Sequence, residues 1–233
     1  MKRGRFALRV HAVLVLLLGS GILQAAEESP GAWGVLDLAG PIGEQAAGGA
    51  WNFAADIQAR YFDIGTGISQ WLVRPSVGYR FAHGVELRLG YGRFRARNRR
   101  GAVVNEDRPY QDLSVVLGKP VAGNLDLRAR LEQRFVDISS EVSHVLRARL
   151  RFRRRVGELT SIEAHYEAFY TLNEADWTGA SRLVQWRLYA GAGRPVGPMR
   201  VELGYMYQHF ENEGLSDLGN HLAIVRVAYR FGG

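Results

Sequence analysis

The residues whose types and spacing could do chemistry lie between positions 125 and 170, where charged side chains recur at every second position. The pattern occurs in three runs, LDLRARLEQRF, HVLRARLRFRRR and TSIEAHYEAFY. Successive side chains of a β-strand leave opposite faces, so this period gathers arginines and carboxylates on one face and apolar residues on the other. Arginine keeps its charge at any accessible pH and binds carboxylates or phosphates through its planar guanidinium. The chemistry indicated is therefore ion pairing or anion binding.

Hydrolysis or acyl transfer is a weaker interpretation of the third run. Ser161, Glu163 and His165 share its charged face, but residues two apart lie about 6–7 Å apart along a strand. Ser161 and His165 are thus too far apart for the direct hydrogen bond that a nucleophile and its base need. The chain also has no cysteine and no His-x-x-x-His pair. We assign His165 to the charged face and predict no catalytic residue, no metal and no cofactor.

The elements that must position these residues are long strands. The three runs extend over about 11–13 residues, and a tilted strand needs about 9–11 residues to cross a bilayer. A strand that is oily on one face and charged on the other needs two solvents, which a barrel with a lipid-facing outside and a polar inside supplies. The sequence predicts an all-β fold, a transmembrane antiparallel up-and-down β-barrel of about 10–12 strands.

Alternating segments on both sides of this region extend the pattern from Trp33 to Phe231. Eleven segments can be counted, whereas bacterial single-chain barrels have even strand numbers. We therefore expect either that Trp33–Ala39 is a plug or an irregular edge, or that a twelfth strand is hidden. Short turns at AHG, KPVAG, RVG and RPVGP alternate with longer loops at residues 97–108, 136–143, 171–180 and 211–219. This alternation is typical of outer-membrane barrels, whose short turns lie in the periplasm.

The N-terminus has the features of a secretory signal peptide. Four basic residues within the first ten positions precede an apolar run at Ala12–Leu23, and small residues follow it. We predict a cleaved signal peptide at residues 1–26 and one barrel domain at residues 27–233, exported to the Gram-negative outer membrane. Removing the four basic residues lowers the formal charge from +7 to 7 − 4 = +3. No nucleic-acid motif is present, so nucleic acid is not an expected partner.

If the charged face is the inner one, it lines the barrel lumen. An arginine column on one strand would then lie between carboxylate-bearing neighbours, which relieve the repulsion between like charges. Two interpretations stay open: a salt-bridged network that fills a small lumen, or a narrow arginine-lined pore that favours anions. The residues of this lumen charge network are Arg128, Arg130, Glu132, Arg134, Arg147, Arg149, Arg151, Arg153, Glu163, His165, Glu167, Arg187 and Glu202.

A second arginine cluster begins at Arg93 and continues into the predicted loop at residues 97–108. The loop lengths place it at the outer surface, where lipopolysaccharide phosphates lie, and a guanidinium suits bidentate contact with phosphate. A solvated basic loop is the alternative. The candidate contacts to lipopolysaccharide phosphate are Arg95, Arg97, Arg99, Arg100 and Arg108.

Several motifs resemble the outer-membrane-barrel family catalogued as domain of unknown function 2490. They are the early Trp33, LEQRF at 131–135, RARLR at 147–151, EAHYEAFY at 163–170, ELGYMYQ at 202–208 and Asn220-His221. The resemblance extends from Trp33 to Phe231 and implies the location and the fold, but no reaction. Barrels of this kind usually end on an aromatic residue that the barrel-assembly machinery reads, whereas here Gly232 and Gly233 follow Phe231.

We thus expect a monomeric outer-membrane barrel, either structural or a narrow anion-favouring pore. Its expected partners are outer-membrane lipid, lipopolysaccharide and, during biogenesis, the assembly machinery. One alternative is an outer-membrane lipid-modifying enzyme. The other is a secreted, soluble β-barrel that binds a small apolar ligand, and it would place the oily face inside and the arginines in water.

Overall fold

The computed structural model describes residues 27–46, 49–62, 68–97, 101–120, 123–178, 180, 182–212 and 216–232. The predicted signal peptide lies outside these residues. The described part contains long strands and one 3-10 helix, η1 (Ala82–Gly84), which forms a tight turn. The strands are β1 (Glu27–Ala46), β2 (Gly49–Phe62), β3 (Ile68–Phe81), β4 (Val85–Arg97), β5 (Val103–Gly118), β6 (Gly123–Val136), β7 (Val142–Val156), β8 (Thr160–Thr171), β9 (Leu183–Val196), β10 (Met199–Phe210) and β11 (Leu218–Arg230).

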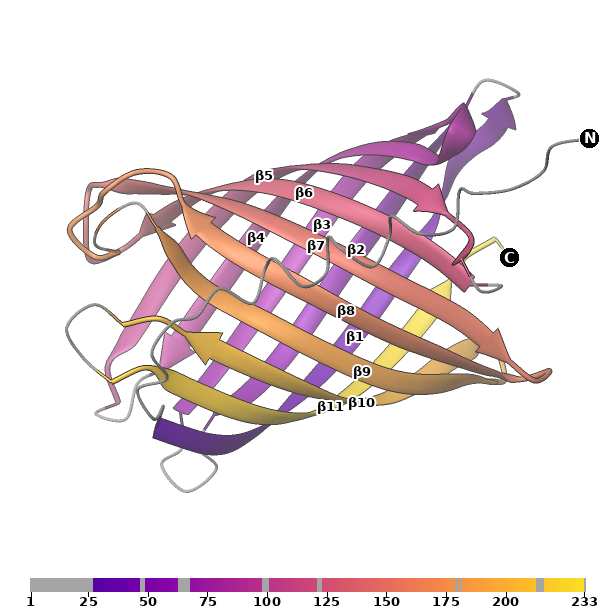
Figure 1. The fold of residues 1–233 in the computed structure, drawn as a ribbon. Helices are drawn as coiled ribbons and strands as arrows, with labels where there is room; N and C mark the ends of the chain where they lie inside the picture. Colours follow the sequence, from indigo (N-terminus) through magenta and orange to yellow (C-terminus); the bar gives the residue numbers. More distant parts are fainter. Residues whose placement is uncertain are drawn as a thin grey trace, which may run out of the picture.

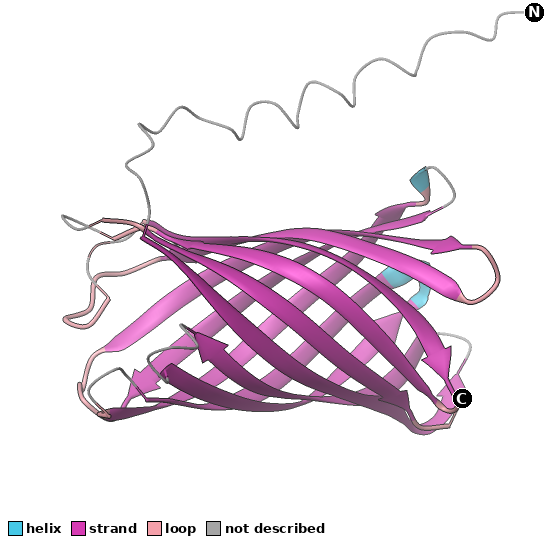
Figure 2. Cartoon of the chain, turned by 90° about the horizontal axis from the view of Figure 1, so that it is seen from below, coloured by secondary structure: helices cyan, strands magenta, loops and turns pink. Residues whose placement is uncertain are grey.

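These strands form a closed barrel in which each strand pairs with its neighbours in the chain (Figure 1). Figure 2 shows that the strands of the wall are strongly tilted relative to the barrel axis. Consecutive strands are antiparallel, and a parallel pairing of β1 with β11 closes the ring, from Glu27 opposite Leu218 to Ala39 opposite Arg230. Strand direction alternates along a meander, so a first and an eleventh strand must run the same way. The prediction of an all-β up-and-down barrel is confirmed.

The strand number departs from the expected even count. Trp33–Ala39 is neither a plug nor an irregular edge, because it lies within β1 and pairs with both β2 and β11. The described residues contain eleven barrel strands and no twelfth. A parallel pairing satisfies the backbone groups of two sheet edges as an antiparallel one does. Closure therefore does not require an even number of strands.

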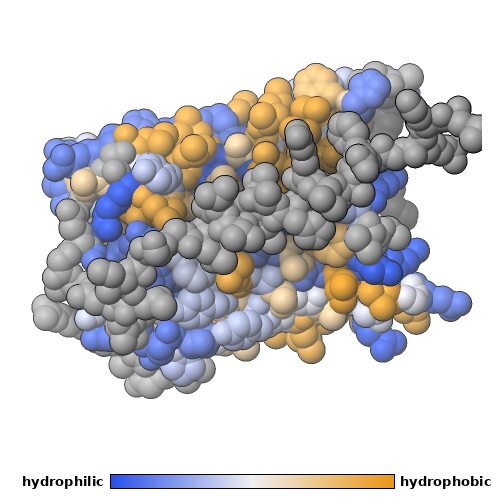
Figure 3. Space-filling model, viewed as in Figure 1, coloured by the Kyte–Doolittle hydropathy of each residue, from blue (hydrophilic) through white to orange (hydrophobic). Residues whose placement is uncertain are grey.

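The outer face of the barrel carries an apolar belt. Figure 3 shows apolar side chains gathered over the middle of the strands and hydrophilic ones toward the two ends. Large apolar side chains are exposed on the outer face of every strand, and from β1 to β11 they include Leu36, Ile57, Val77, Leu87, Leu113, Leu127, Leu146, Ile162, Leu188, Leu203 and Val225. A belt of this kind has no partner in water and matches the lipid-facing surface of a membrane barrel. Among the described residues, no helix is long and apolar enough to cross a membrane.

Aromatic residues border the belt at both ends. At the end where the short turns lie, the ring centres of Trp51 and Tyr79 are 5.1 Å apart and those of Phe53 and Phe231 are 5.6 Å apart. At the other end, the ring of Trp186 packs against that of Tyr207 and stacks on His209. Amphipathic rings favour the boundary between hydrocarbon and water, and membrane barrels carry two girdles of this kind.

The connections differ in length between the two ends of the barrel, which we call the turn end and the loop end. Residues 197–198 join β9 to β10 at the turn end, whereas residues 172–182 join β8 to β9 at the loop end. Within the longer connection Ala175 is buried, and Trp177 Nε1 donates to the backbone oxygen of Glu141 at 3.1 Å. Connections at the loop end therefore pack against one another.

Two inward-facing tyrosines lie flat against glycines of the wall. A Cβ atom added at Gly90 would lie 2.2 Å from Tyr110 Cζ on the neighbouring strand. A Cβ atom added at Gly204 would lie 2.4 Å from the hydroxyl oxygen of Tyr189. No side chain larger than hydrogen fits beneath these rings, so glycine allows each tyrosine to cover the adjacent strand.

We expect Gly90→Ala to destabilise the barrel by about 1–3 kcal/mol, because the added methyl group displaces the ring of Tyr110 from a packed site. Urea unfolding of the detergent-solubilised protein measures the change. Gly34→Ala is the matched control, since a Cβ atom there would meet nothing within 4 Å. Equal unfolding midpoints for the two variants would show that the Tyr110 ring does not need this glycine.

Candidate functional site in the barrel lumen

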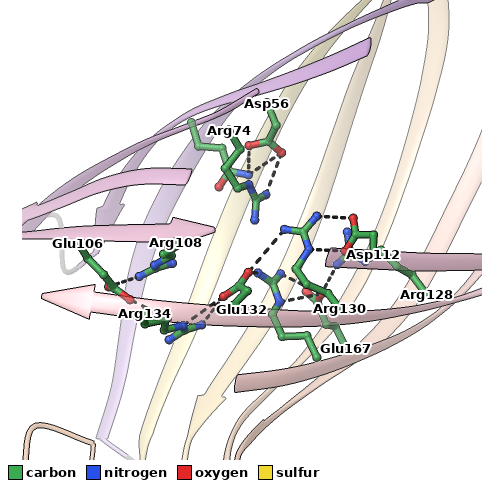
Figure 4. A network of polar contacts seen from close by, with 12 residues as sticks. Asp56, Arg74, Glu106, Arg108, Asp112, Arg128, Arg130, Glu132, Arg134 and Glu167 are labelled. Carbon is green, nitrogen blue, oxygen red and sulfur yellow. Dashed lines mark hydrogen bonds and ion pairs between the residues drawn. The ribbon is translucent and has the colours of Figure 1, made fainter. Parts of the chain in front are cut away.

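The charged faces of the strands point into the lumen, where single carboxylates contact several guanidinium groups at once (Figure 4). Glu132 on β6 is completely buried and accepts hydrogen bonds from Arg147 Nη1 at 2.5 Å and Arg134 Nη2 at 2.8 Å. Arg130 Nη1 lies 3.5 Å from Glu132 Oε1. Arg130 also donates to both oxygens of Asp112, from Nε at 2.6 Å and Nη2 at 2.7 Å. An ionised carboxylate can accept several such bonds, so one acid partners arginines from two strands.

Glu167 on β8 is a second carboxylate of this kind. Its Oε1 accepts hydrogen bonds from Arg147 Nη2 at 2.9 Å and from Arg128 Nη2. Its Oε2 lies 3.8 Å from Arg187 Nη1. Arg147 thus bridges Glu132 and Glu167, and side-chain contacts connect the lumen wall from β6 to β9.

A third cluster lies on the wall near β9 and β10. Tyr189 donates its hydroxyl hydrogen to Glu202 Oε1 at 2.6 Å, and Arg226 Nη1 lies 3.0 Å from the same oxygen. The imidazole of His165 stacks on the ring of Tyr189, with 4.7 Å between centres, and its Nδ1 lies 3.4 Å from Glu163 Oε1. His165 therefore contacts an acid and an aromatic ring. Within the described part of the chain, no group of three or more histidine, cysteine, aspartate or glutamate side chains could hold a metal ion.

Toward the loop end, arginine and aromatic side chains alternate across the lumen. The Cζ atom of Arg108 lies 4.1 Å from the ring centre of Phe94, and that of Arg60 lies 5.8 Å from it on another side. Arg60 Cζ is also 4.2 Å from the ring centre of Trp33, and Arg187 Cζ is 5.1 Å from it. A guanidinium over an aromatic face gains cation–π attraction, which partly replaces the water lost on burial.

Phe169 continues this series, with the Cζ atoms of Arg187 and Arg147 each 4.4 Å from its ring centre. Leu72 lies opposite Phe94 in register, and apolar side chains from β10 and β11 pack with Trp33. Every strand thus contributes a side chain that is at most 8% exposed. We call this layer the septum, and its members from β1 to β11 are Trp33, Arg60, Leu72, Phe94, Arg108, Glu132, Arg147, Phe169, Arg187, Met206 and Leu222.

On the turn side of the septum, several inward-facing charges are less buried, although Glu163 and Glu202 stay buried. The side chain of Arg153 is 38% exposed and that of Asp37 is 37% exposed. We call this open part of the lumen the vestibule, and the charged residues that line it include Asp37, Asp126, Arg151, Arg153, Arg200 and Arg226. The lumen is therefore filled toward the loop end and open toward the turn end.

The structure places every residue of the predicted lumen network on the inner face of its strand, but it does not give each one a partner. Arg149 has no ion pair or hydrogen bond with any described residue, and its Nε atom is buried. Its register neighbours are Arg128 on β6 and Glu167 on β8, and Arg128 itself bonds to Glu167. The two-residue period predicted that Arg149 faces the lumen. It did not predict that the neighbouring acid, Glu167, is already bonded to Arg128.

The aromatic members of the septum were missed by sequence reasoning. Phe169 occupies the next same-parity position after Glu163, His165 and Glu167, and Phe94 lies on the charged parity of β4. An aromatic residue that continues a charged parity is the signal that could have found them.

Arg95 and Arg97, from the second arginine cluster, are exposed on the outer face of β4 near the loop end. Neither has an ion pair with a described residue. Their neighbour Arg93 is neutralised by Asp107, with 2.7 Å between Arg93 Nη1 and Asp107 Oδ2. Arg99 and Arg100, which belong to the same prediction, lie outside the described residues.

The predicted loop position of Arg108 is wrong. β5 begins at Val103, so the predicted loop at residues 97–108 is shorter and Arg108 lies within a strand. Its side chain is buried in the septum, where Arg108 Nη2 donates to Glu106 Oε2 at 2.5 Å. Glu106 and Arg108 face the lumen and belong to the polar face of β5. Charged residues of this kind resemble a polar loop in the sequence, so the start of the strand was not recognised.

An acid in the same region stays outside the barrel wall. Asp137 lies in the connection between β6 and β7 and accepts hydrogen bonds from the side chain of Asn105 at 2.6 Å and from its backbone N–H at 3.0 Å. These bonds lower the pKa of Asp137, so Asp137 stays negatively charged near the second arginine cluster.

Comparison with known proteins identifies the family of the chain. The profile of the family described as "Protein of unknown function (DUF2490)" matches residues 30–218. The chain belongs to this family. The predicted membership of DUF2490 is thereby confirmed, and the description of the family names no activity.

Two individual proteins are similar to this DUF2490 chain. An uncharacterized protein of Methylorubrum extorquens strain AM1 is 27% identical over 233 residues, covering 96% of this chain and 98% of the relative. Among solved structures, the β domain of the Bordetella autotransporter Brka aligns with a TM-score of 0.46 and 15% identity, covering 77% of this chain and 83% of that one.

Replacing Glu132 with glutamine removes the charge on which Arg147, Arg134 and Arg130 converge. Breaking a buried ion pair by neutralising one partner costs about 3–5 kcal/mol, so we expect Glu132→Gln to lower the free energy of unfolding by that order. Urea unfolding followed by circular dichroism measures it. Glu158→Gln is the control, because Glu158 is exposed in the turn between β7 and β8. If both variants unfold at the same urea concentration, Glu132 does not hold the network together.

Proposed function

We propose that the protein is an outer-membrane β-barrel of the closed type, in which the charged lumen is a structural core and not an open pore. The observation that carries this proposal is the septum. Each strand contributes one side chain to it, and none is more than 8% exposed. A column of water cannot pass a layer in which every wall residue is buried against its neighbours.

The proposed location is supported by the two faces of the barrel. An apolar belt with aromatic girdles faces outward, whereas the arginines face the enclosed space. A soluble carrier of an apolar ligand would need the opposite arrangement, with the oily parity inside. Because β1 and β11 pair within one chain, no second copy is needed to close the wall, and a monomer suffices. We further propose export by the predicted signal peptide and insertion by the barrel-assembly machinery.

A narrow anion-favouring pore is the second candidate function, and one observation favours it. Arg149 has no carboxylate of its own, and the lining of the vestibule is rich in arginine. Rings of arginine favour anions over cations. For this function the septum would have to open, which requires separating Arg147 from Glu132 and Glu167.

We also propose that Arg95 and Arg97 bind lipopolysaccharide phosphates on the outer surface. Both are exposed on the outer face of β4, and neither has a carboxylate partner among the described residues. Arg93 and Asp107 pair beside them, so the unneutralised positive charge of this face belongs to Arg95 and Arg97. A planar guanidinium can contact two phosphate oxygens at once.

Single-channel recording in planar bilayers tests the closed barrel. We expect no steady conductance from the wild-type protein. The double variant Trp33→Ala/Arg60→Ala removes two adjacent side chains of the septum and should conduct, with a preference for anions because the other lumen arginines remain. Trp51→Ala is the control, since this tryptophan belongs to the outer girdle. A steady anion current through the wild-type protein would overturn the closed barrel and establish the pore.

Isolation of outer membranes tests the location and the lipopolysaccharide contact together. We expect the wild-type protein in the outer-membrane fraction, with lipopolysaccharide retained after detergent extraction. Arg95→Gln/Arg97→Gln should stay in that fraction but retain several-fold less lipopolysaccharide, because two charge-assisted contacts are lost. Arg194→Gln at the turn end is the control. Unchanged retention in the double variant refutes the contact, and recovery of the protein in the soluble fraction refutes the location.

A further inference from the structure

A cavity of about 420 Å³ lies at the turn end of the barrel, on the wall formed by β1, β2, β3 and the end of β11. Ligand sites commonly have volumes of about 300–1,000 Å³ and contain a few convergent polar groups. The lining contains three arginines, Arg80, Arg88 and Arg230, together with Asn52. It contains no aspartate and no glutamate.

The cavity lies where the barrel wall changes height. β11 ends at Arg230, which pairs with Ala39, whereas β1 continues to Ala46 and stays paired with β2 (Figure 1). Beyond Ala39 the wall therefore has no β11 beside it. At this step, the inner face of the barrel and its outer aromatic girdle border the same space.

The arginines of this cavity are only partly neutralised. Arg80 and Arg88 share one carboxylate, that of Glu86, and the side chain of Arg80 is 61% exposed. Arg88 also donates to Asn52 and, at 3.0 Å, to Ser76 Oγ, so its guanidinium is held in place. Arg230 has no ion pair or hydrogen bond with any described residue. The charge of the cavity is therefore positive, and Arg230 and Arg80 have free donors.

The other part of the lining is aromatic. Trp51, Phe53 and Phe231 contribute to the cavity, and all three belong to the girdle at the turn end. The close contact of Phe53 and Phe231 is possible because Gly40 lies between them, where a Cβ atom would be 2.8 Å from the Phe53 ring. A molecule in this cavity would meet guanidinium groups on one side and aromatic rings on the other.

We propose that this cavity binds the headgroup of a phospholipid from the periplasmic leaflet. The phosphate would accept hydrogen bonds from Arg230 and Arg80, and the acyl chains would leave the cavity over Phe53 and Phe231 into the bilayer. Three arginines without an acid in the lining suit a phosphodiester anion. Girdle aromatics lie at the level of lipid headgroups. This inference rests on the proposed membrane location, which also places lipopolysaccharide at the opposite end of the barrel.

Native mass spectrometry of the full-length protein isolated in detergent tests the proposal. The probes are phosphatidylglycerol, diacylglycerol, which has the same acyl chains without phosphate, and inorganic phosphate. We expect retention of one phosphatidylglycerol per barrel and no retention of diacylglycerol. Arg230→Gln/Arg80→Gln should bind phosphatidylglycerol at least about tenfold more weakly, because two charge-assisted hydrogen bonds are lost. Arg155→Gln, an exposed arginine at the same end but outside the cavity, should bind as the wild type does.

We expect the fold to tolerate these substitutions, since Arg230 has no partner among the described residues and Glu86 keeps Arg88 when Arg80 is replaced. Unchanged phosphatidylglycerol binding in the double variant overturns the site. Inorganic phosphate that binds as tightly as the lipid overturns the lipid assignment, because the aromatic wall would then contribute nothing. This binding measurement is independent of the isolation of outer membranes. If the protein were recovered in the soluble fraction but still bound phosphatidylglycerol through Arg230 and Arg80, the proposed function would be refuted and the lipid site would stand.

Discussion

A guanidinium group cannot lose its charge at any accessible pH, so every arginine on the inner face must find an acid, an aromatic ring or water. The lumen supplies all three in different places. Glu132 and Glu167 partner several arginines each, Phe94 and Phe169 lie beneath guanidinium groups, and the vestibule leaves the side chain of Arg153 partly exposed to solvent. In the proposed membrane location, opening the wall would expose these charges to hydrocarbon, where an unpaired charge costs far more than in water. The inner charges therefore favour the closed shape of the barrel together with its backbone hydrogen bonds.

The seam between β1 and β11 is the place where closure is hardest, because parallel pairing is slightly less stable per residue than antiparallel pairing. Side chains reinforce it on both faces. Inside, Arg226 Nε lies 3.3 Å from Asp37 Oδ2 across the seam. Outside, His221 Nε2 lies 2.6 Å from Glu28 Oε2 near the loop end. The odd strand is thus incorporated by the same kinds of contact that hold the rest of the wall, and β1 is as much a barrel strand as any other.

The sequence predicted the faces of the strands well, because the direction of a side chain depends only on the local period of two. It did so for Arg147, Glu167 and Arg149, which all face the lumen. It also placed the arginines of β7 between acids of the neighbouring strands, where Arg147 does meet Glu132 and Glu167. It could not predict the contacts across the lumen, since these join strands that are far apart in the chain. Arg60 on β2 and Arg187 on β9 both lie over Trp33, and no local pattern connects them. Eleven segments were counted and eleven strands form the barrel. The expectation of an even strand number was wrong for a related reason: closure depends on how the two terminal strands pair with each other.

The two ends of the barrel differ in the length of their connections, and this difference determines from which end the charged lumen is accessible. At the loop end, Arg134 and Glu106 lie 3.7 Å apart, and the connection between β8 and β9 packs against the connection between β6 and β7. At the turn end, the connections are short and cannot cover the lumen, so the vestibule stays open. With the septum closed, as proposed, an anion would reach the inner arginines from the turn end. The exposed arginines Arg80 and Arg230 belong to the rim at that end and carry positive charge that an anion would meet there.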